Sequence, residues 1–420
     1  MKMKKMQHLW TGVILLLLMV LFTVSAAASD PDIAITAETF PDAVFRAYVA
    51  AAADSSGDGM LSEAERAAVT NISVSESGIT SLKGIEYFPA LQSLYCDFNQ
   101  LTALDVSHNP ALVFLACDNN ALTTLDVSSC PALSILTCCN NQLTTLNVSG
   151  CTALTYLDCG WGMNNVFTKN QLTQLDVRDC SALKTLNCSY NRLTEIDLNN
   201  CTTLQTLNCS YNQLTKLNIS NCSAMGSLEC SSNQLTVLDI SACTAMTWLS
   251  CRSNKIEALD LRQNVLLTYL ACDNNQLATL DLSTIPDLMS LYCGYNQLTT
   301  LDISNNTSLT RLSCYYNQLT QLVFGHNKML TSLICHNNQL TKLDVRECTA
   351  LETLNCELNL LTELDAGECS AMTLLNCKGN QLTKLDVSGC VALTTLSCES
   401  AHFYNWTENS GTSVVLRETA

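Results

Sequence analysis

Hydrophobic and polar positions repeat along most of the chain with a period of 21 residues. The segment from Leu204 to Ala224 reads LQTLNCSYNQLTKLNISNCSA, and the segment from Met225 keeps its skeleton, LxxLxCxxNxLTxLDVSxCxA. Full copies begin at Leu91, Leu112, Leu133, Leu154, Leu183, Leu204, Met225, Met246, Leu267, Leu288, Leu309, Leu330, Leu351 and Met372, and a partial copy begins at Leu393. A fixed period of this length indicates a solenoid in which each copy forms one turn.

Each copy divides into two similar halves, LxxLxCxxNx and LxxLxIxxCxx in the copy from Leu204. The alternation of apolar residues in each half predicts a short strand with one face inward. A single copy cannot bury its apolar face alone, so stacking of neighbours must supply the core. The predicted fold is therefore a β-rich superhelix with short parallel strands on two faces. Stacked at the usual strand spacing, its rungs would form a rod roughly 70 Å long.

Two columns of residues mark the bends that follow the predicted strands. The first column runs through Asn99, Asn120, Asn141, Asn191, Asn212, Asn233 and on to Asn380. The second holds Cys130, Cys151, Cys180, Cys201, Cys222, Cys243, Cys348, Cys369 and Cys390, with Asn109, Asn264, Asn306 and Asn327 elsewhere and Ile285 as the exception. We expect the amides to bond backbone groups left unpaired at each bend, and the thiols to act there as weak donors.

The chain contains 25 cysteines, which in an exported protein would ordinarily indicate a disulfide framework. Fifteen of them occupy one inward strand column, from Cys96 to Cys398, and nine occupy the second bend column. Neighbouring parallel strands hold their Cβ atoms about 4.8 Å apart, whereas a disulfide requires about 3.5 to 4.5 Å. We therefore predict buried free thiols. Cys139 alone falls outside both columns and is predicted to point to solvent.

The repeat resembles that of bacterial leucine-rich-repeat proteins, specifically the nested class whose 21-residue unit reads LxxLxCxxNxLxxLDLxxNxx. The resemblance covers the chain from Leu91 to Cys398. It implies a secreted or surface interaction protein, with no enzymatic activity. Secreted bacterial solenoid proteins of this type often carry a small module before their repeats.

Residues 1–28 have the features of a secretory signal peptide. The opening MKMKKMQH is followed by an apolar run from Leu9 to Val20 and by small residues that provide an A-x-A-like cleavage site. No later segment is apolar and long enough to span a bilayer, so a secreted or cell-surface location is expected. The net charge of −17 argues against nucleic acid and anionic membrane surfaces as partners.

Residues 29–69 form a predicted helical, EF-hand-like N-terminal cap. A helical pattern over 41–52 precedes DSSGDGMLSEAE, which matches the twelve-residue calcium loop of an EF-hand. The predicted ligands of a structural Ca²⁺ are Asp54, Ser56, Asp58, Met60 through its carbonyl, Ser62 and Glu65. The alternative is a plain helix start, because Ser62 and Glu65 also have the spacing of a capping box.

Residues 70–398 form the predicted solenoid. Its divergent first rung is expected to direct Ile79, Leu82, Ile85 and Leu91 to the core, since capping repeats are atypical. The copy over 154–182 has eight extra residues, in which Trp161 and Phe167 favour a contact loop over a plain surface bulge. Residues 399–420 leave the repeat and are predicted to form a C-terminal cap or tail, with a closing strand over 413–417.

No catalytic constellation is visible in the sequence. The histidines that follow the signal peptide are His108, His326, His336 and His402, and none has a cysteine or serine and an acid at a converging spacing. Thiols in a dry interior column are inert as nucleophiles. The prediction is a protein that is not an enzyme.

The outward strand positions vary from copy to copy, and aromatic and arginine residues gather in the copies from Met246 to Gln339. The predicted binding surface comprises Trp248, Arg252, Tyr269, Asp273, Tyr292, Tyr295, Arg311, Tyr315, Tyr316 and His336. Such residues are enriched at interface hot spots, although tyrosine also suits an exposed strand. We expect a protein partner, with a host or surface glycoprotein as one candidate. The alternatives are a structural spacer or surface-layer component without a ligand, and a glycan-binding protein.

Overall fold

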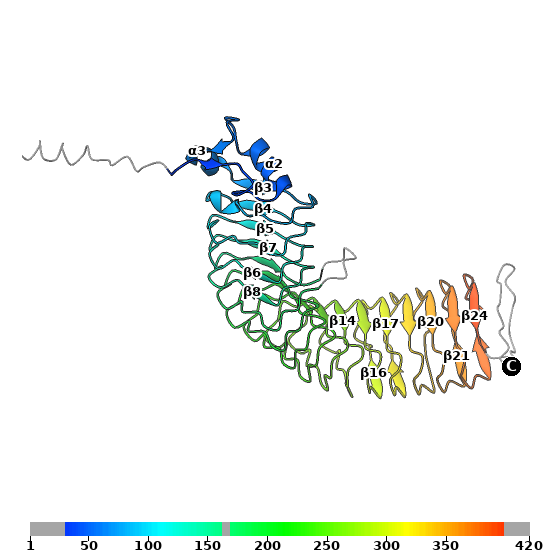
Figure 1. Ribbon diagram of the computed structural model, residues 1–420. Coiled ribbons are helices and arrows are strands. Elements are labelled where there is room, and N and C mark those ends of the chain that lie inside the picture. Colours follow the sequence, from blue (N-terminus) through cyan, green and yellow to red (C-terminus); the bar gives the residue numbers. More distant parts are fainter. Residues whose placement is uncertain (1–29, 162–168, 399–420) are drawn as a thin grey trace, which may run out of the picture.

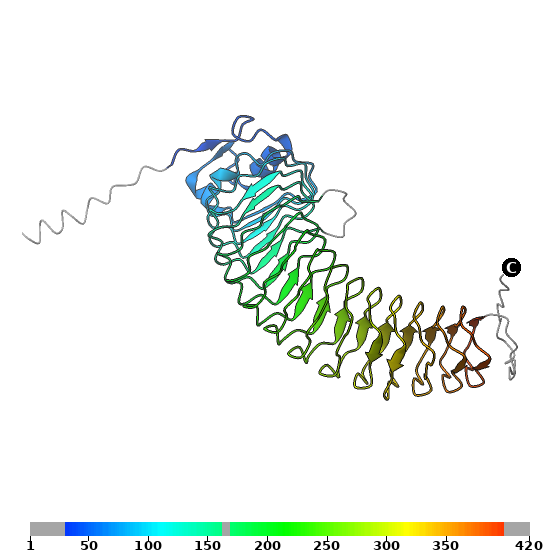
Figure 2. The ribbon, with the colours of Figure 1, turned by 90° about the horizontal axis from the view of Figure 1, so that it is seen from below.

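The computed structural model describes residues 30–161 and 169–398, which form a curved solenoid (Figures 1 and 2). One parallel sheet of sixteen short strands follows the whole solenoid and lines its concave side (Figure 1). In spatial order its strands are β24 (Thr395–Ser397), β22 (Leu374–Asn376), β20 (Thr353–Asn355), β19 (Ser332–Ile334), β17 (Arg311–Ser313), β15 (Ser290–Tyr292), β14 (Tyr269–Ala271), β13 (Trp248–Ser250), β12 (Ser227–Glu229), β11 (Thr206–Asn208), β10 (Thr185–Asn187), β9 (Tyr156–Asp158), β7 (Ile135–Thr137), β5 (Phe114–Ala116), β4 (Ser93–Tyr95) and β3 (Asn71–Ser73).

The opposite, convex side carries strands at only some rungs. They form three two-stranded sheets, β6 (Thr124–Asp126) with β8 (Thr145–Asn147), β16 (Thr300–Asp302) with β18 (Gln321–Val323), and β21 (Glu363–Asp365) with β23 (Lys384–Asp386). Parallel strands thus lie on both faces, as predicted, but only those of the concave side form a continuous sheet, and the rungs follow an arc (Figure 1). Curvature holds the rungs at strand spacing on the concave side and spreads them on the convex side, where ladder hydrogen bonds are lost.

The core lies between the two sides and consists of leucine and cysteine columns. Paired strands are in register, so that Leu207 lies opposite Leu228 and both are buried. All 25 cysteines are free and buried, which confirms the predicted free thiols and, for every cysteine except Cys139, their predicted burial. Burial raises the pKa of the Cys314 thiol to about 12, which keeps it protonated at neutral pH.

The prediction that Cys139 points to solvent is wrong. Its side chain is only 9% exposed, and its backbone N–H donates to Asp118 Oδ1 at 2.6 Å. Burial raises the pKa of the Cys139 thiol, and the charge of Asp118 adds to that rise. The position follows an inward cysteine on the concave face, where side chains of adjacent rungs cover one another. A cysteine outside the two predicted columns can therefore still be buried.

The first bend column forms the predicted asparagine ladder. Asn233 Nδ2 lies 3.0 Å from the carbonyl oxygens of both Cys209 and Cys230, and Asn233 Oδ1 accepts from Leu214 N at 2.9 Å. The same pattern recurs at Asn212 and along the solenoid to Asn380. Each amide thus joins its own turn to the preceding rung and satisfies buried backbone groups that no strand partner reaches.

The second bend column shows that cysteine and asparagine occupy equivalent positions. Cys151 Sγ lies 3.3 Å from the carbonyl oxygen of Val127, in the preceding rung. Asn264 Nδ2 contacts the corresponding carbonyl oxygen of Ile240 at 3.1 Å and that of Cys243 at 2.9 Å. The expected donor role of the thiols is confirmed, with sulfur as the weaker donor.

The N-terminal segment comprises β1 (Ile33–Ala34), α2 (Ala43–Ala52), β2 (Met60–Leu61) and α3 (Glu63–Ala68), and the 3-10 helix η1 (Ile85–Tyr87) follows in the first rung. Phe40, Phe45 and Phe88 are fully buried and join this segment to the solenoid core. Asp42 caps α2 and also accepts from the Thr80 N–H at 2.9 Å. The predicted inward residues of the first rung, Ile79, Leu82, Ile85 and Leu91, are buried.

Several predictions from the sequence concern residues outside the described ranges. These are the signal peptide over 1–28, Phe167 in the inserted loop, His402, and the tail over 399–420 with its closing strand at 413–417.

Removing a ladder amide should destabilise the solenoid. We expect Asn233→Ala to lower the free energy of unfolding by about 2 to 4 kcal/mol, because it leaves buried carbonyl and N–H groups unpaired. Urea denaturation followed by circular dichroism measures this. The matched control is Asn221→Ala, which removes an exposed side chain whose Nδ2 also reaches the preceding rung, 3.0 Å from Asn199 O. Equal losses for the two variants would contradict the structural importance of the ladder.

Candidate functional site

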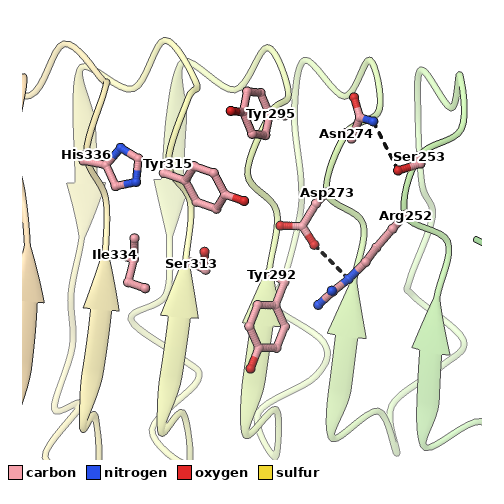
Figure 3. A pocket seen from close by; sticks show the side chains of 10 residues that line it. All are labelled: Arg252, Ser253, Asp273, Asn274, Tyr292, Tyr295, Ser313, Tyr315, Ile334 and His336. Atoms are coloured by element: carbon pink, nitrogen blue, oxygen red, sulfur yellow. Dashed lines mark hydrogen bonds and ion pairs between the residues drawn. The ribbon is translucent and has the colours of Figure 1, made fainter.

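The concave sheet has a hollow of about 850 Å³ at the rungs of β13 to β19 (Figure 3). Its lining residues are Arg252, Ser253, Asp273, Asn274, Tyr292, Tyr295, Ser313, Tyr315, Ile334 and His336. They come from neighbouring rungs, and so from segments of the chain that only the stacking brings together.

The strand pleat explains why these side chains face outward. The central leucine of each strand and the cysteine two positions later point to the core, so the residues between and after them lie on the outer face of the sheet. Tyr292, Ser313 and Ile334 end their strands between leucine and cysteine. Arg252 and Asp273 directly follow the inward cysteines of their rungs.

Arg252 is held by residues from two following rungs. Its Nε lies 3.1 Å from Asp273 Oδ2, and its NH2 group donates to Tyr269 Oη at 3.2 Å. The guanidinium also lies 4.8 Å from the centre of the Tyr292 ring, a cation–π contact. With the side chain still 40% exposed, this arrangement presents a pre-oriented guanidinium edge to a ligand.

Aromatic rings border the hollow on both sides. The rings of Trp248 and Tyr269 are parallel, with their centres 3.5 Å apart, and Tyr292 follows at 5.6 Å from Tyr269. On the far side the Tyr315 ring lies 4.9 Å from that of His336. These contacts fix the rings before a ligand arrives, which lowers the entropy cost of binding.

Gly294 helps to open the hollow, and the sequence interpretation missed it. A Cβ atom at this position would lie 2.7 Å from the ring of Tyr315. Gly294 occupies the slot after the inward cysteine that Arg252, Asp273 and Tyr315 occupy in adjacent rungs. An alignment of the repeats would have shown that Gly294 has no side chain at the position where the adjacent copies have Asp273 and Tyr315. Ser253, Asn274, Ser313 and Ile334 were also missed, because small or common residues stand out only when their neighbours are known.

The structure brings most of the predicted binding residues together. Six of them line the hollow, namely Arg252, Asp273, Tyr292, Tyr295, Tyr315 and His336. Trp248 and Tyr269 extend the surface on one side, and Tyr316 stacks on Tyr295 at 4.6 Å. Arg311 is exposed on β17 and does not line the hollow.

Burial sets the protonation preferences inside the hollow. It raises the pKa of the Asp273 carboxyl, while Arg252 and the Gly294 N–H at 3.1 Å oppose that rise. Burial also lowers the pKa of His336, against the charge of Glu357. A neutral imidazole beside Tyr315 leaves Arg252 as the cationic group that lines the hollow.

Two further carboxyl groups are partly buried on the same sheet nearer the N-terminus. Burial raises the pKa of Asp118 and of Asp158, the charge of Asp97 adds to the rise at Asp118, and the charge of Asp118 adds to the rise at Asp158. Asp118 accepts hydrogen bonds from Thr137 Oγ1 at 2.5 Å and from Cys139 N at 2.6 Å. Asp158 accepts one from Asn187 Nδ2 at 2.9 Å.

The predicted calcium ligands lie in the loop between α2 and α3. Asp54 accepts hydrogen bonds from the N–H groups of Gly57 and Gly59, and Gly59 has a φ of +80°. Glu65 Oε1 accepts from the N–H groups of Ser55 and Ser56, both at 2.9 Å.

The remaining predicted ligands have local roles. Asp58 Oδ1 accepts from Met60 N at 2.8 Å. Ser62 and Glu65 form the capping box of α3, as the alternative interpretation predicted. Within 30–161 and 169–398, no three histidine, cysteine or acidic residues are close enough together to hold a metal ion.

The described histidines do not share a site. His108 contacts Ser107 at 3.0 Å, and His326 lies 3.5 Å from Glu347. His336 belongs to the hollow, where its neighbours are aromatic and amide groups.

The architecture, with one strand per 21-residue turn on the concave side and an asparagine ladder in the turns, defines a leucine-rich-repeat protein. Among solved structures the chain resembles the functional domain of InlJ from Listeria monocytogenes, which includes a cysteine ladder. Identity is 34% and the TM-score 0.72, and the match covers 89% of this chain and 77% of that domain. The chain therefore belongs to the internalin-like leucine-rich-repeat proteins with a cysteine ladder.

Other comparisons cover less or show the fold alone. Internalin J of L. monocytogenes serotype 4b is 37% identical over 70 residues, 17% of this chain and only 8% of that protein's length. A leucine-rich-repeat protein of Leptospira interrogans is 24% identical with a TM-score of 0.59, covering 74% of this chain and 77% of the other. The LVIVD repeat model matches residues 230–250 and 291–317, which lie within the solenoid. Among the described residues, no helix has the length and apolar character needed to cross a membrane.

The partly buried carboxyl group of Asp118 should make the stability of the protein depend on pH. Its native pKa lies above its unfolded value, so its stabilising contribution is complete below about pH 4 and is lost as the pH rises through the native pKa. Asp118→Asn keeps acceptor and donor groups for Cys139 N and Thr137 Oγ1 but does not titrate. We expect the melting temperature of the variant, relative to that of the unsubstituted protein, to increase as the pH is raised from 4 to 7.5. The opposite trend would mean that hydrogen bonds outweigh burial at this carboxylate.

Proposed function

We propose that this protein is a non-enzymatic, secreted or cell-surface protein that binds a protein partner through the concave hollow and its aromatic border. The observation that carries the proposal is the fixed guanidinium of Arg252, which lies among half-exposed aromatic rings on the outer face of the sheet. Arginine and aromatic side chains that are partly shielded from water commonly contribute most of the binding energy at protein interfaces.

The properties of the hollow indicate what the partner presents. Arg252 is oriented but still half-exposed, and it lies above the apolar floor of Tyr292. An acidic or carbonyl-rich segment flanked by an apolar side chain fits this combination. The rest of this acidic chain would repel a strongly acidic partner, so the contact is expected to be local. A host or surface glycoprotein is one protein class that could supply such a segment.

The N-terminal helices are proposed to cap the solenoid and to bind one structural Ca²⁺. The arrangement that favours calcium is a helix–loop–helix in which β2, the loop's seventh and eighth positions, pairs with β1. The oxygen donors of Asp54, Asp58 and the Met60 carbonyl suit a hard cation. Glu65 would exchange its contacts with the Ser55 and Ser56 amides for the ion, which would hold the loop against the first rung.

Substitutions in the hollow should weaken the partner complex without unfolding the protein. We expect Arg252→Ala and Tyr292→Ala each to weaken binding tenfold or more, since each removes an anchor of the surface. The measurement is capture of the partner from the native surroundings by the immobilised chain, followed by titration. Arg262→Ala is the matched control, because Arg262 is an exposed arginine on another face, paired with Asp260. Unchanged capture by the hollow variants would favour a structural spacer, and capture of glycan alone would favour a glycan-binding protein.

Calcium should raise the melting temperature of the protein, because a ligand that binds only the folded state stabilises it. Asp58→Ala should abolish this rise, since it removes a ligand carboxylate while costing only the hydrogen bond to Met60 N. Scanning fluorimetry with Ca²⁺ and with a chelator measures both. Glu63→Ala, an exposed acid outside the ligand set, should keep the full response. If the melting temperature does not change with calcium, the calcium proposal is wrong and the loop serves only to cap the helix.

A further inference from the structure

A second surface lies beside the hollow, along the turns that follow the concave strands. Most of these turns contain one residue with a left-handed backbone, and together these residues form what we call the turn row. Its non-glycine members, with φ between 49° and 56°, are Glu76, Phe98, Asn119, Asn140, Tyr190, Tyr211, Ser232, Ser253, Asn274, Tyr295, Tyr316, Asn337 and Leu358.

The tyrosines of the turn row occupy backbone positions that disfavour them. A left-handed conformation is tolerated by glycine and asparagine but is costly for a bulky side chain. The row itself contains asparagine at several rungs, so the scaffold accepts the less strained residue. Burial does not offset the cost, because Tyr211 is 49%, Tyr295 48% and Tyr316 44% exposed. Because the strain at these exposed tyrosines is not offset by burial, we infer that the tyrosines are kept for a function at the surface.

The tyrosines are arranged as two stacked pairs. The ring centres of Tyr190 and Tyr211 are 4.1 Å apart at an interplanar angle of 11°, and those of Tyr295 and Tyr316 are 4.6 Å apart at 5°. Face-to-face stacking turns the outer face of Tyr211 along the row toward Ser232. The outer face of Tyr295 is turned in the same way toward Asn274, and Figure 3 shows both side chains among those that line the hollow.

Small and neutral polar side chains separate the two pairs. Ser232, Ser253 and Asn274 occupy the row between Tyr211 and Tyr295, a distance of four rungs or about 19 Å. A parallel column of exposed side chains runs beside them, formed by Gln213, Gln234, Lys255, Gln276 and Gln297. The four glutamine side chains make no hydrogen bond to any residue of 30–161 or 169–398, so their amides are available to a ligand.

We propose that the turn row from Tyr211 to Tyr295 binds an extended neutral polysaccharide. An aromatic face accepts the C–H groups that line one side of a pyranose ring, and the hydroxyl groups on its edge match serine hydroxyls and side-chain amides. A single file of such groups suits a linear polymer better than a folded protein. A protein partner would need about 800 Å² of contiguous surface on this side. The segment shares Ser253, Asn274 and Tyr295 with the edge of the hollow, whereas Tyr211 and Ser232 lie outside it. It adds a second ligand to the proposed function.

The test uses substitutions that relieve strain while removing the ring. The full chain is run in native gels containing a soluble β-glucan, a mannan or a galactan, and retardation gives the affinity. We expect retardation by at least one of them, about tenfold weaker affinity for Tyr211→Asn and for Tyr295→Asn, and loss of retardation in the double variant. The melting temperatures should be unchanged or higher, because asparagine suits the left-handed turn. Leu358→Asn, in the same row outside the proposed segment, should bind normally.

The proposal would be overturned by no retardation with any of the three polysaccharides, by equal retardation of the double variant, or by a clear fall in melting temperature for both single variants. The last result would make the tyrosines structural. Binding of a protein partner that is lost in Tyr211→Asn, without polysaccharide binding, would also overturn it. Tyr292→Ala separates the two sites, since it should weaken capture of the protein partner and leave polysaccharide retardation intact.

Discussion

The structure depends on the hydrogen bonds of one buried amide per rung. In a solenoid every turn carries backbone groups into the interior, where they cannot reach water or a strand partner. Asn254 satisfies them by donating to the carbonyl oxygens of Cys230 and Cys251, both at 3.1 Å, and by accepting from Leu235 N at 3.0 Å. Because the same contacts recur at each turn, the concave strands stay in register and their outward side chains form straight columns. The hollow and the turn row are both built from those columns.

In the second bend column the asparagine amides find partners for their N–H groups but not always for their oxygen atoms, which has an energetic cost. Asn109, Asn264 and Asn306 donate to carbonyl oxygens of the preceding rung, but their Oδ1 atoms are buried and accept no hydrogen bond within the described residues. An unpaired buried acceptor costs about 1 to 3 kcal/mol. A thiol donates more weakly, yet it brings no strong acceptor into the core. This difference explains why cysteine holds most positions of this column, although asparagine is the better donor.

The period in the sequence determined the fold, the inward columns and the set of residues that share the concave face. Arg252, Asp273 and Tyr292 could be placed near one another because each occupies a known position in its copy. Their contacts could not be predicted, since an arginine can reach several rungs and its choice of Asp273, Tyr269 and Tyr292 depends on distances of a few tenths of an ångström. The burial of Cys139 was missed for a related reason. Exposure on a sheet face is set by the side chains of adjacent rungs, which a single copy does not contain.

The curvature of the solenoid also lay beyond the sequence pattern. Both halves of each copy alternate in the same way, and on that evidence both should form strands. On the convex side, however, aspartate and asparagine side chains bond the backbone two residues on, as Asp239 Oδ1 does with Ser241 N at 3.0 Å. The paired convex strands carry the same bond, as Asp302 Oδ1 does with Ser304 N at 2.9 Å, so this local contact does not decide which convex rungs pair. The ladder then supports the concave turns rung by rung, and a local cost such as a left-handed tyrosine is shared with its neighbours. A scaffold of this kind can carry strained surface residues that a small single-core domain would lose.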